Sequence, residues 1–233
     1  MTTSISAPPP STDMQAVLIQ GITLQQQGRH AEATALFRQV LAHDPHNAAA
    51  LYSLAVAALH AADPAEALRI AQLGTAAAPG FAPLHNVLGS ALQRLGRPEE
   101  AVVAFDQALA LGGEQADVLL NSGVALRTLF RHKEALERFL RVLAIAPDHA
   151  SALGNAGILL TEFKQSEQAI AMFQRLLAVQ PDYDYSTGLL HYERMHVCDW
   201  QGIAPLSHAI VEGIRAGRRS CKSLAFMALS DDD

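Results

Sequence analysis

Two asparagines stand out as groups that can bind another chain, because they occupy equivalent places in the sequence. Asn121 lies in the segment LLNSG and Asn155 in GNAG, each two residues before a glycine. An amide both donates and accepts hydrogen bonds, so a row of amides can hold the backbone of an extended peptide without selecting a side chain. Alternatively, each amide bonds to a neighbouring helix, as buried polar groups commonly do. The sequence leaves both interpretations open.

The histidines and cysteines near the C-terminus are the other residues with chemistry of their own. His191, His196 and Cys198 have spacings at which side chains on one helix do not converge on a zinc ion. Cys198 and Cys221 are the only two cysteines, too few for a disulfide framework and too far apart for a CxxC motif. We therefore expect packing or linker roles for these side chains, two reduced thiols, and no metal, cofactor or catalytic residue.

Charge and hydropathy exclude some classes of partner. The net charge of −6 disfavours nucleic acid, whose phosphates dominate its affinity for proteins. One basic cluster, Arg215, Arg218, Arg219 and Lys222, is either an anion site or a solvated helix end. The N-terminus lacks the features of a secretory signal, and the apolar stretch 47–62 is too short for a membrane span. We expect a cytoplasmic protein without a membrane or nucleic-acid partner.

The elements that position these residues follow a repeat of 34 residues. Prolines mark four points of this lattice and a glycine marks the fifth: Pro45, Pro79, Gly113, Pro147 and Pro181. The lattice defines five repeats: 14–47, 48–81, 82–115, 116–149 and 150–183. Residues 1–13 are expected to form a disordered tail, and residues 184–233 a helical cap or linker.

Three positions within the repeat carry side chains of constant type. Position 20 is always alanine, position 8 is glycine or alanine, and position 24 is phenylalanine except in repeat 2, which has Ala71. We expect each repeat to form two antiparallel helices, an A helix over its first part and a B helix over most of the remainder. Small residues allow the A helix and the B helix to approach closely, and the phenylalanine is expected to fill the gap against the next repeat. Gly28 and Gly96 suit a turn with positive φ, and Pro64 and Pro98 suit the first turn of a helix.

This pattern resembles the tetratricopeptide repeat (TPR) family over residues 14–183. The resemblance implies an all-α fold, a right-handed TPR superhelix or α-solenoid of five helix pairs, followed by C-terminal capping helices. The A helices would line a concave groove, and the side chains expected there are Tyr52, Asn86, Arg94, Asn121, Thr128, Asn155 and Glu162. Leu18 and Ile22 occupy places where a carboxylate-clamp cochaperone would carry lysine and asparagine, which argues against that subclass.

A second resemblance covers residues 186–233, where HYERMHVCDW is followed by LAFMALSDD. These segments are similar to the connector between TPR units and catalytic lobes in bacterial O-GlcNAc transferases of the SPINDLY type. The resemblance implies a UDP-GlcNAc-dependent glycosyltransferase in a longer parent protein, with the catalytic residues outside this chain.

Three hypotheses for function follow. The first is a protein-protein interaction module that binds a protein or extended peptide in the groove, and it is not an enzyme by itself. The second is the acceptor-recognition part of an O-GlcNAc transferase-like protein. The third is a self-assembling array, which would require a large exposed apolar patch.

Overall fold

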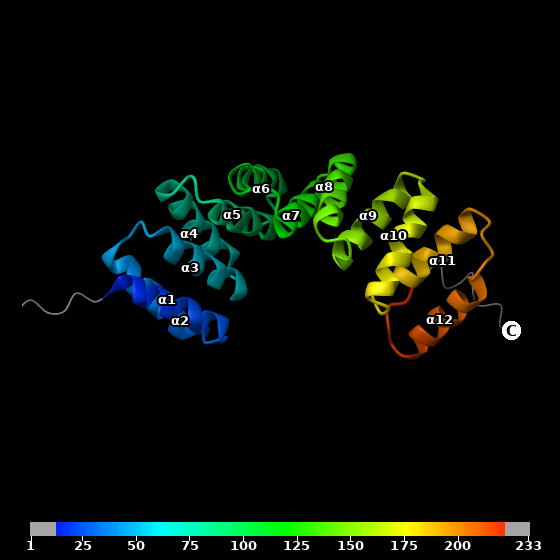
Figure 1. Ribbon diagram of the computed structural model, residues 1–233, viewed down its shortest axis with the longest axis horizontal. Helices are drawn as coiled ribbons and strands as arrows, with labels where there is room; N and C mark the ends of the chain where they lie inside the picture. Colours follow the sequence, from blue (N-terminus) through cyan, green and yellow to red (C-terminus); the bar gives the residue numbers. More distant parts are fainter. Residues whose placement is uncertain (1–12, 222–233) are drawn as a thin grey trace, which may run out of the picture. The chain divides into compact units, whose positions relative to one another are not determined.

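The computed structural model describes residues 13–221, and these residues form twelve α-helices with no β-strand among them (Figure 1). The helices are α1 (Met14–Gln26), α2 (His30–His43), α3 (Ala48–His60), α4 (Pro64–Ala77), α5 (Ala82–Arg94), α6 (Pro98–Gly112), α7 (Ala116–Thr128), α8 (His132–Ile145), α9 (Ala150–Glu162), α10 (Ser166–Val179), α11 (Ser186–His196) and α12 (Ile203–Arg215). The expected all-α fold class is confirmed for this part of the chain.

The chain divides into two compact units, each with its own packing. The N-terminal unit, Met1–Gly113, contains α1 to α6, and the C-terminal unit, Glu114–Asp233, contains α7 to α12. Within each unit, consecutive helices pack in pairs, such as α5 with α6 and α7 with α8. We call the odd-numbered helices α1 to α9 the A helices and the even-numbered helices α2 to α10 the B helices.

The helix ends follow the 34-residue lattice. Helix α2 ends two residues before Pro45, and α4, α8 and α10 end in the same way before their prolines. Proline stops these helices because it lacks the N–H group that the next helical hydrogen bond needs. Helix α6 has no such proline and ends at Gly112, where Gly113 takes a φ of +74°.

The turns between A and B helices all contain a residue with positive φ. Gly28 and Gly96 have φ values of +77° and +71°, as the sequence predicts. In the other three repeats the same place holds a residue with a side chain: Ala62, Phe130 or Lys164, with φ of +57° to +58°. The left-handed region costs such residues free energy that glycine avoids, so these three turns are locally strained.

The core of four repeats is a contact between a glycine and a phenylalanine. A Cβ atom placed on Gly123 would lie 2.6 Å from the ring of Phe139, and Gly21, Gly89 and Gly157 meet Phe37, Phe105 and Phe173 in the same way. All four rings are fully buried. The prediction placed the phenylalanine against the next repeat and missed this contact, in which the ring packs on the glycine of its own repeat.

The last two helices follow α10 without a further 34-residue repeat. Helix α11 packs on α10 and on α12. Residues 219 and 220 then return to the start of α11, where the Ser220 carbonyl accepts a hydrogen bond of 3.0 Å from the Gly188 N–H. Arg218 pairs with Asp182, and Arg219 lies 3.6 Å from Asp184. Arg215 pairs with Glu212 at 2.8 Å, so the three arginines of the basic cluster are paired with carboxylates of their own chain. Lys222 lies outside the described residues.

Two expectations fall partly or wholly on residues that the structure does not describe. These are the tail, of which only Asp13 is described, and the segment LAFMALSDD. Asp13 caps α1, since its carboxylate accepts a hydrogen bond from the Gln15 N–H at 3.0 Å. In residues 13–221, no helix combines the length and the apolar character that crossing a bilayer requires.

Candidate peptide-binding surface

In the N-terminal unit, Tyr52 and Arg94 bind to neighbouring parts of the protein. The Tyr52 ring on α3 packs edge-on against Phe81, with centroids 6.2 Å apart and planes at 87°. Arg94, the last residue of α5, donates from Nη1 to the Leu59 carbonyl oxygen at 2.5 Å. This carbonyl lies in the last turn of α3, where helical carbonyls lack partners within the helix and favour a cation. Both side chains therefore stabilise the contact between consecutive A helices.

Asn86, also on α5, has an unusual position. Its Oδ1 atom is buried and has no hydrogen-bond partner among the described residues. Its backbone carbonyl accepts from Ser90 Oγ at 3.0 Å, which leaves the side-chain amide unaffected. A buried carbonyl oxygen without a donor carries a desolvation cost, which a donor from another molecule would relieve.

In the C-terminal unit, the two asparagines of the predicted row differ in their bonding. Asn155 on α9 is half-buried and donates from Nδ2 to the Ser151 carbonyl at 2.7 Å, within its own helix. Asn121 on α7 is also half-buried, yet its side-chain amide forms no hydrogen bond with any described residue. One amide is thus partly satisfied locally, whereas the other keeps its donor and acceptor available.

Thr128 and Glu162 lie at the ends of α7 and α9 and are both exposed. Thr128 Oγ1 donates to the Val124 carbonyl at 3.0 Å, a local bond within α7. A carboxylate oxygen of Glu162 lies 2.8 Å from Nδ1 of His132, the first residue of α8. No hydrogen bond joins two of the seven predicted groove residues within residues 13–221, so the structure places them singly along the A helices.

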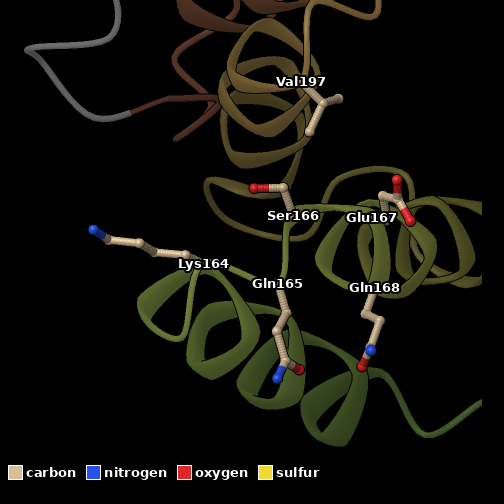
Figure 2. Close-up of a pocket in the computed structure, with 6 residues that line it drawn as sticks. All are labelled: Lys164, Gln165, Ser166, Glu167, Gln168 and Val197. Carbon is tan, nitrogen blue, oxygen red and sulfur yellow. The ribbon is translucent and has the colours of Figure 1, made fainter.

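A polar cavity at the end of α9 was not anticipated from the sequence. This corner cavity has a volume of about 350 Å³ and is lined by Thr161, Glu162, Lys164, Ser166, Tyr192, Glu193 and His196. A neighbouring cavity of about 320 Å³ shares Lys164 and Ser166 with it and extends to Val197 (Figure 2). The residues that line it come from the region of three helices, α9, α10 and α11, so no short sequence motif could have predicted it. Of the seven, only Glu162 was predicted as a site residue.

A second unpredicted hollow lies in the N-terminal unit, between α2, α3 and α4, with a volume of about 490 Å³. Its floor is mainly apolar and includes Leu51, Leu54 and Ile70. Charged side chains stand around it, among them Glu66 and Arg69, which pair with each other at 2.7 Å. This pairing lowers the pKa of the Glu66 carboxyl below its usual range.

A serine-histidine pair joins α11 to α12. His191 is buried, and its Nε2 lies 3.0 Å from Ser207 Oγ. Ser207 donates its own hydrogen to the Ile203 carbonyl at 3.1 Å, so the hydroxyl accepts from the histidine rather than giving it a proton. Burial lowers the pKa of His191 and favours the neutral ring. The pair is a structural link between two helices and not an activated nucleophile.

The thiols and acidic groups of the described region form no metal centre. Within residues 13–221, no three His, Cys, Asp or Glu side chains gather closely enough to hold a metal ion. Cys198 is exposed and Cys221 is half-buried, and neither forms a disulfide. Burial raises the pKa of the Cys221 thiol and so keeps it protonated and unreactive at neutral pH.

Comparison with known proteins identifies the repeat. Two family models, both described as tetratricopeptide repeat, match residues 24–91, and residues 81–148 and 114–182. No curated protein matches the chain significantly.

Solved structures share the fold at low sequence identity. PilF of Pseudomonas aeruginosa superposes with a TM-score of 0.78 at 21% identity, covering 94% of this chain and 97% of that chain. PilW, a type IV pilus biogenesis factor, gives 0.73 at 18% identity, covering 89% and 96%. YrrB, described as a TPR protein with an unusual peptide-binding site, gives 0.62 at 23% identity, covering 79% and 91%.

Proposed function

The chain belongs to the tetratricopeptide-repeat family, and from this premise we propose that it binds an extended segment of a partner protein along its A helices. The observation that carries the proposal is Asn121, a half-buried amide on α7 that forms no hydrogen bond within the described residues. An amide that is partly removed from water and unpaired is well suited to receive a peptide N–H and C=O. In the N-terminal unit, taken by itself, the buried and unpartnered Oδ1 of Asn86 on α5 is a second amide that could accept a hydrogen bond from a partner.

The other predicted groove residues have supporting roles in this proposal. Asn155 keeps its Oδ1 as an acceptor, since only its Nδ2 is engaged with the Ser151 carbonyl. Arg94 and Tyr52 hold neighbouring helices in place and line the surface rather than bind strongly. Among the structural relatives, YrrB is a TPR protein with a peptide-binding site, which makes peptide binding a function that this fold can perform.

A selection from a random peptide library tests the proposal. The wild-type chain is expected to retain a family of peptides, and the double change Asn121→Ala with Asn155→Ala is expected to weaken their binding about tenfold or more. The far-ultraviolet circular dichroism spectrum should stay unchanged, because both side chains are removable without a cavity in the core. Equal affinity of the double variant would mean that the two asparagines have only a structural role.

Two exposed amides on B helices provide a matched control. Gln107 lies on α6 and Gln174 on α10, one in each compact unit. The double change Gln107→Ala with Gln174→Ala removes the same kind of group from the other helices and should leave peptide affinity unaltered. A loss of affinity equal to that of the asparagine variant would place the binding surface elsewhere.

The second candidate function is the acceptor-recognition part of a glycosyltransferase. It is supported by the resemblance of residues 186–233 to the connector of SPINDLY-type O-GlcNAc transferases. The intact mass of the native polypeptide tests it, since a mass far above 24.9 kDa would show a longer parent protein. A mass near 24.9 kDa would leave a free-standing adaptor. For either candidate we propose a cytoplasmic location, in keeping with two unpaired cysteines.

A further inference from the structure

The wall of the corner cavity contains a buried acidic residue. The Glu193 side chain on α11 lines the cavity and is only 2% exposed. It is one of the few charged side chains that are buried in the part of the chain that the structure describes. Taking a carboxylate out of water without a compensating charge or donor is costly, so buried carboxylates are almost always paired. A cationic group that entered the cavity would supply such a charge.

A hydroxyl in the same cavity is unsatisfied. Thr161 Oγ1, near the end of α9, is buried and has no hydrogen-bond partner in the part of the chain that the structure describes. Ser166, the first residue of α10, lies across the turn and lines the cavity with it. Two hydroxyl oxygens and a carboxylate together form a set of acceptors, which suits a ligand with several N–H donors.

The remaining walls favour a cation over other ligands. Glu162 adds a second carboxylate, whose single described partner is Nδ1 of His132. Tyr192 packs on His196 with centroids 4.3 Å apart, and aromatic rings of this kind attract cations. An anion would be repelled by the two carboxylates, and an apolar group would leave Thr161 without a partner.

Among the described residues, Lys164 is the only lysine that lines the cavity, and its ammonium group does not pair with the carboxylates there. It sits in the left-handed position of the turn between α9 and α10 and is exposed. Figure 2 shows its side chain extending outward, with the ammonium group away from the other labelled residues. A divalent metal ion is also a poor fit, since no metal-holding set of three ligands exists in residues 13–221.

We infer that the corner cavity binds a basic side chain, lysine or arginine, carried by the partner segment. This inference rests on the proposed peptide binding, since Glu162 belongs both to the predicted groove and to the cavity. The ammonium or guanidinium group would pair with Glu193, and Thr161 and Ser166 would accept its remaining hydrogens. The aliphatic stem would lie against Tyr192. The cavity would thereby select a basic side chain at one position of the peptide. The asparagines bind the peptide backbone and select no side chain.

A small probe tests the cavity without any knowledge of the partner. Nα-acetyl-lysine amide is titrated into the full chain, and Nα-acetyl-norleucine amide, which lacks the charge, is the matched ligand control. The lysine derivative should shift the backbone NMR signals of Thr161, Ser166 and Tyr192, and the norleucine derivative should not. Equal shifts with both compounds, or no shift with either, would overturn the inference.

Substitution of Glu193 provides a second test of the cavity. Glu193→Gln keeps the shape of the side chain and should weaken binding of the lysine derivative about tenfold or more. Glu167→Gln is the control, because Glu167 is exposed and lines only the neighbouring cavity. It should leave the affinity unchanged. Should Glu193→Gln fail to fold, Tyr192→Ala, at an exposed position, is expected to weaken binding in the same assay, and unchanged binding would refute the site.

The peptide selection separates this inference from the proposed function. If peptides bind, replacing their lysine or arginine by norleucine should lower affinity in the wild-type chain and much less in Glu193→Gln. If the bound peptides keep their affinity after this replacement, the basic-side-chain site is refuted and the proposed function stands. Binding of the lysine derivative by a chain that selects no peptide would refute the proposed function and leave the cavity as a cation site.

Discussion

Contacts between single residues set how closely the two helices of a repeat can pack. In four repeats a glycine on the A helix faces a buried phenylalanine on the B helix, at a distance that leaves no room for a methyl group. Repeat 2 has alanine at both places, Ala55 and Ala71, and both are fully buried. The two positions are therefore complementary in volume, which is how repeat 2 keeps the fold without the ring.

The pair Gly123 and Phe139 offers a direct test of this complementarity. Gly123→Ala should destabilise the wild-type chain by about 1–3 kcal/mol, because the new methyl overlaps a rigid buried ring. Phe139→Ala alone should cost about 3–5 kcal/mol through the cavity it leaves. In that background Gly123→Ala should instead stabilise, by up to about 1 kcal/mol, because alanine is the better helix former. Urea unfolding of the four proteins measures this change of sign.

The control for the glycine test is Gly80→Ala, at a position where an added Cβ would meet no atom within 4 Å. Its free energy of unfolding should stay close to that of the wild-type chain. If Gly123→Ala destabilised the chain equally with and without the Phe139 ring, the volume argument would be wrong.

His191 gives the described part of the chain a predictable dependence on pH. Burial lowers its folded-state pKa, whereas in the unfolded chain it titrates near its ordinary value of about 6.5. The unfolded state therefore binds more protons as the pH falls through this value, and the free energy of unfolding decreases. The stability that neutral His191 contributes is fully present above about pH 6.5 and is lost below it.

The measurement is urea unfolding at several pH values for the wild-type chain and for His191→Gln, which can still donate to Ser207. The loss of stability between pH 7 and pH 5 should be smaller in the variant. The exposed His208 on the neighbouring helix is the matched control, and His208→Gln should keep the wild-type dependence. Identical pH profiles for wild type and His191→Gln would contradict the buried neutral histidine.

Many of the residues that matter for packing could be predicted from the sequence, but only where one residue type recurs at a fixed spacing. The small residues at position 8 and the phenylalanines at position 24 were identified in this way, although their mutual contact within a repeat was not. Glu193 and Thr161 were missed because they come from different helices, and Glu193 lies beyond the last repeat. The bonding of Asn155 to Ser151 was also beyond the sequence, since the rotamer of an amide depends on its surroundings.

At the scale of the elements, the turns between A and B helices differ in strain. Gly28 and Gly96 adopt positive φ at no steric cost, but Ala62, Phe130 and Lys164 adopt it with a side chain. The sequence predicted the two glycine turns correctly. It could not show that the other three repeats keep the same turn, since nothing in alanine, phenylalanine or lysine indicates positive φ.

A reciprocal pair of substitutions measures this strain. Ala62→Gly should raise the free energy of unfolding by about 1 kcal/mol, because it removes the steric cost of the left-handed conformation. Gly96→Ala should lower it by a similar amount. The thermal unfolding midpoint of each variant provides the measurement. A loss of stability in Ala62→Gly would show that the flexibility of glycine in the unfolded chain outweighs the relief of strain.

Ion pairs at the start of the B helices are a further feature that the repeat pattern did not predict. Arg29 pairs with Glu32 at 2.6 Å, and Arg97 pairs with Glu100 at the same distance. The hydrogen bond from arginine lowers the pKa of Glu32 and of Glu100 below the usual range. These pairs are exposed to water and contribute little to stability.

At the scale of the whole molecule, the chain consists of two compact units that meet in sequence at Gly113 and Glu114. Residues 111 to 115, around this boundary, are all exposed. The sequence predicted five repeats at equal spacing and contained no sign of this division, because the lattice continues through it. We retain the five repeats over 14–183 as a proposal for the domain organisation, with residues 184–233 as a cap.

Limited proteolysis tests the division into units. A protease of low specificity should cleave early within residues 111–115, where an exposed chain contains two adjacent glycines, and release two fragments that resist further digestion. Mass spectrometry of the early products identifies the sites. First cleavage inside a helix pair, for example between α3 and α4, would contradict two separately packed units.

Photo-crosslinking shows directly whether partner segments bind to the A helices. A peptide selected on the wild-type chain is made with a photoreactive side chain at successive positions, and the crosslinked residues are identified by mass spectrometry. We expect crosslinks on α7 and α9 of the C-terminal unit, close to Asn121 and Asn155. Crosslinks confined to the B helices, such as α8 and α10, would contradict binding to the A helices.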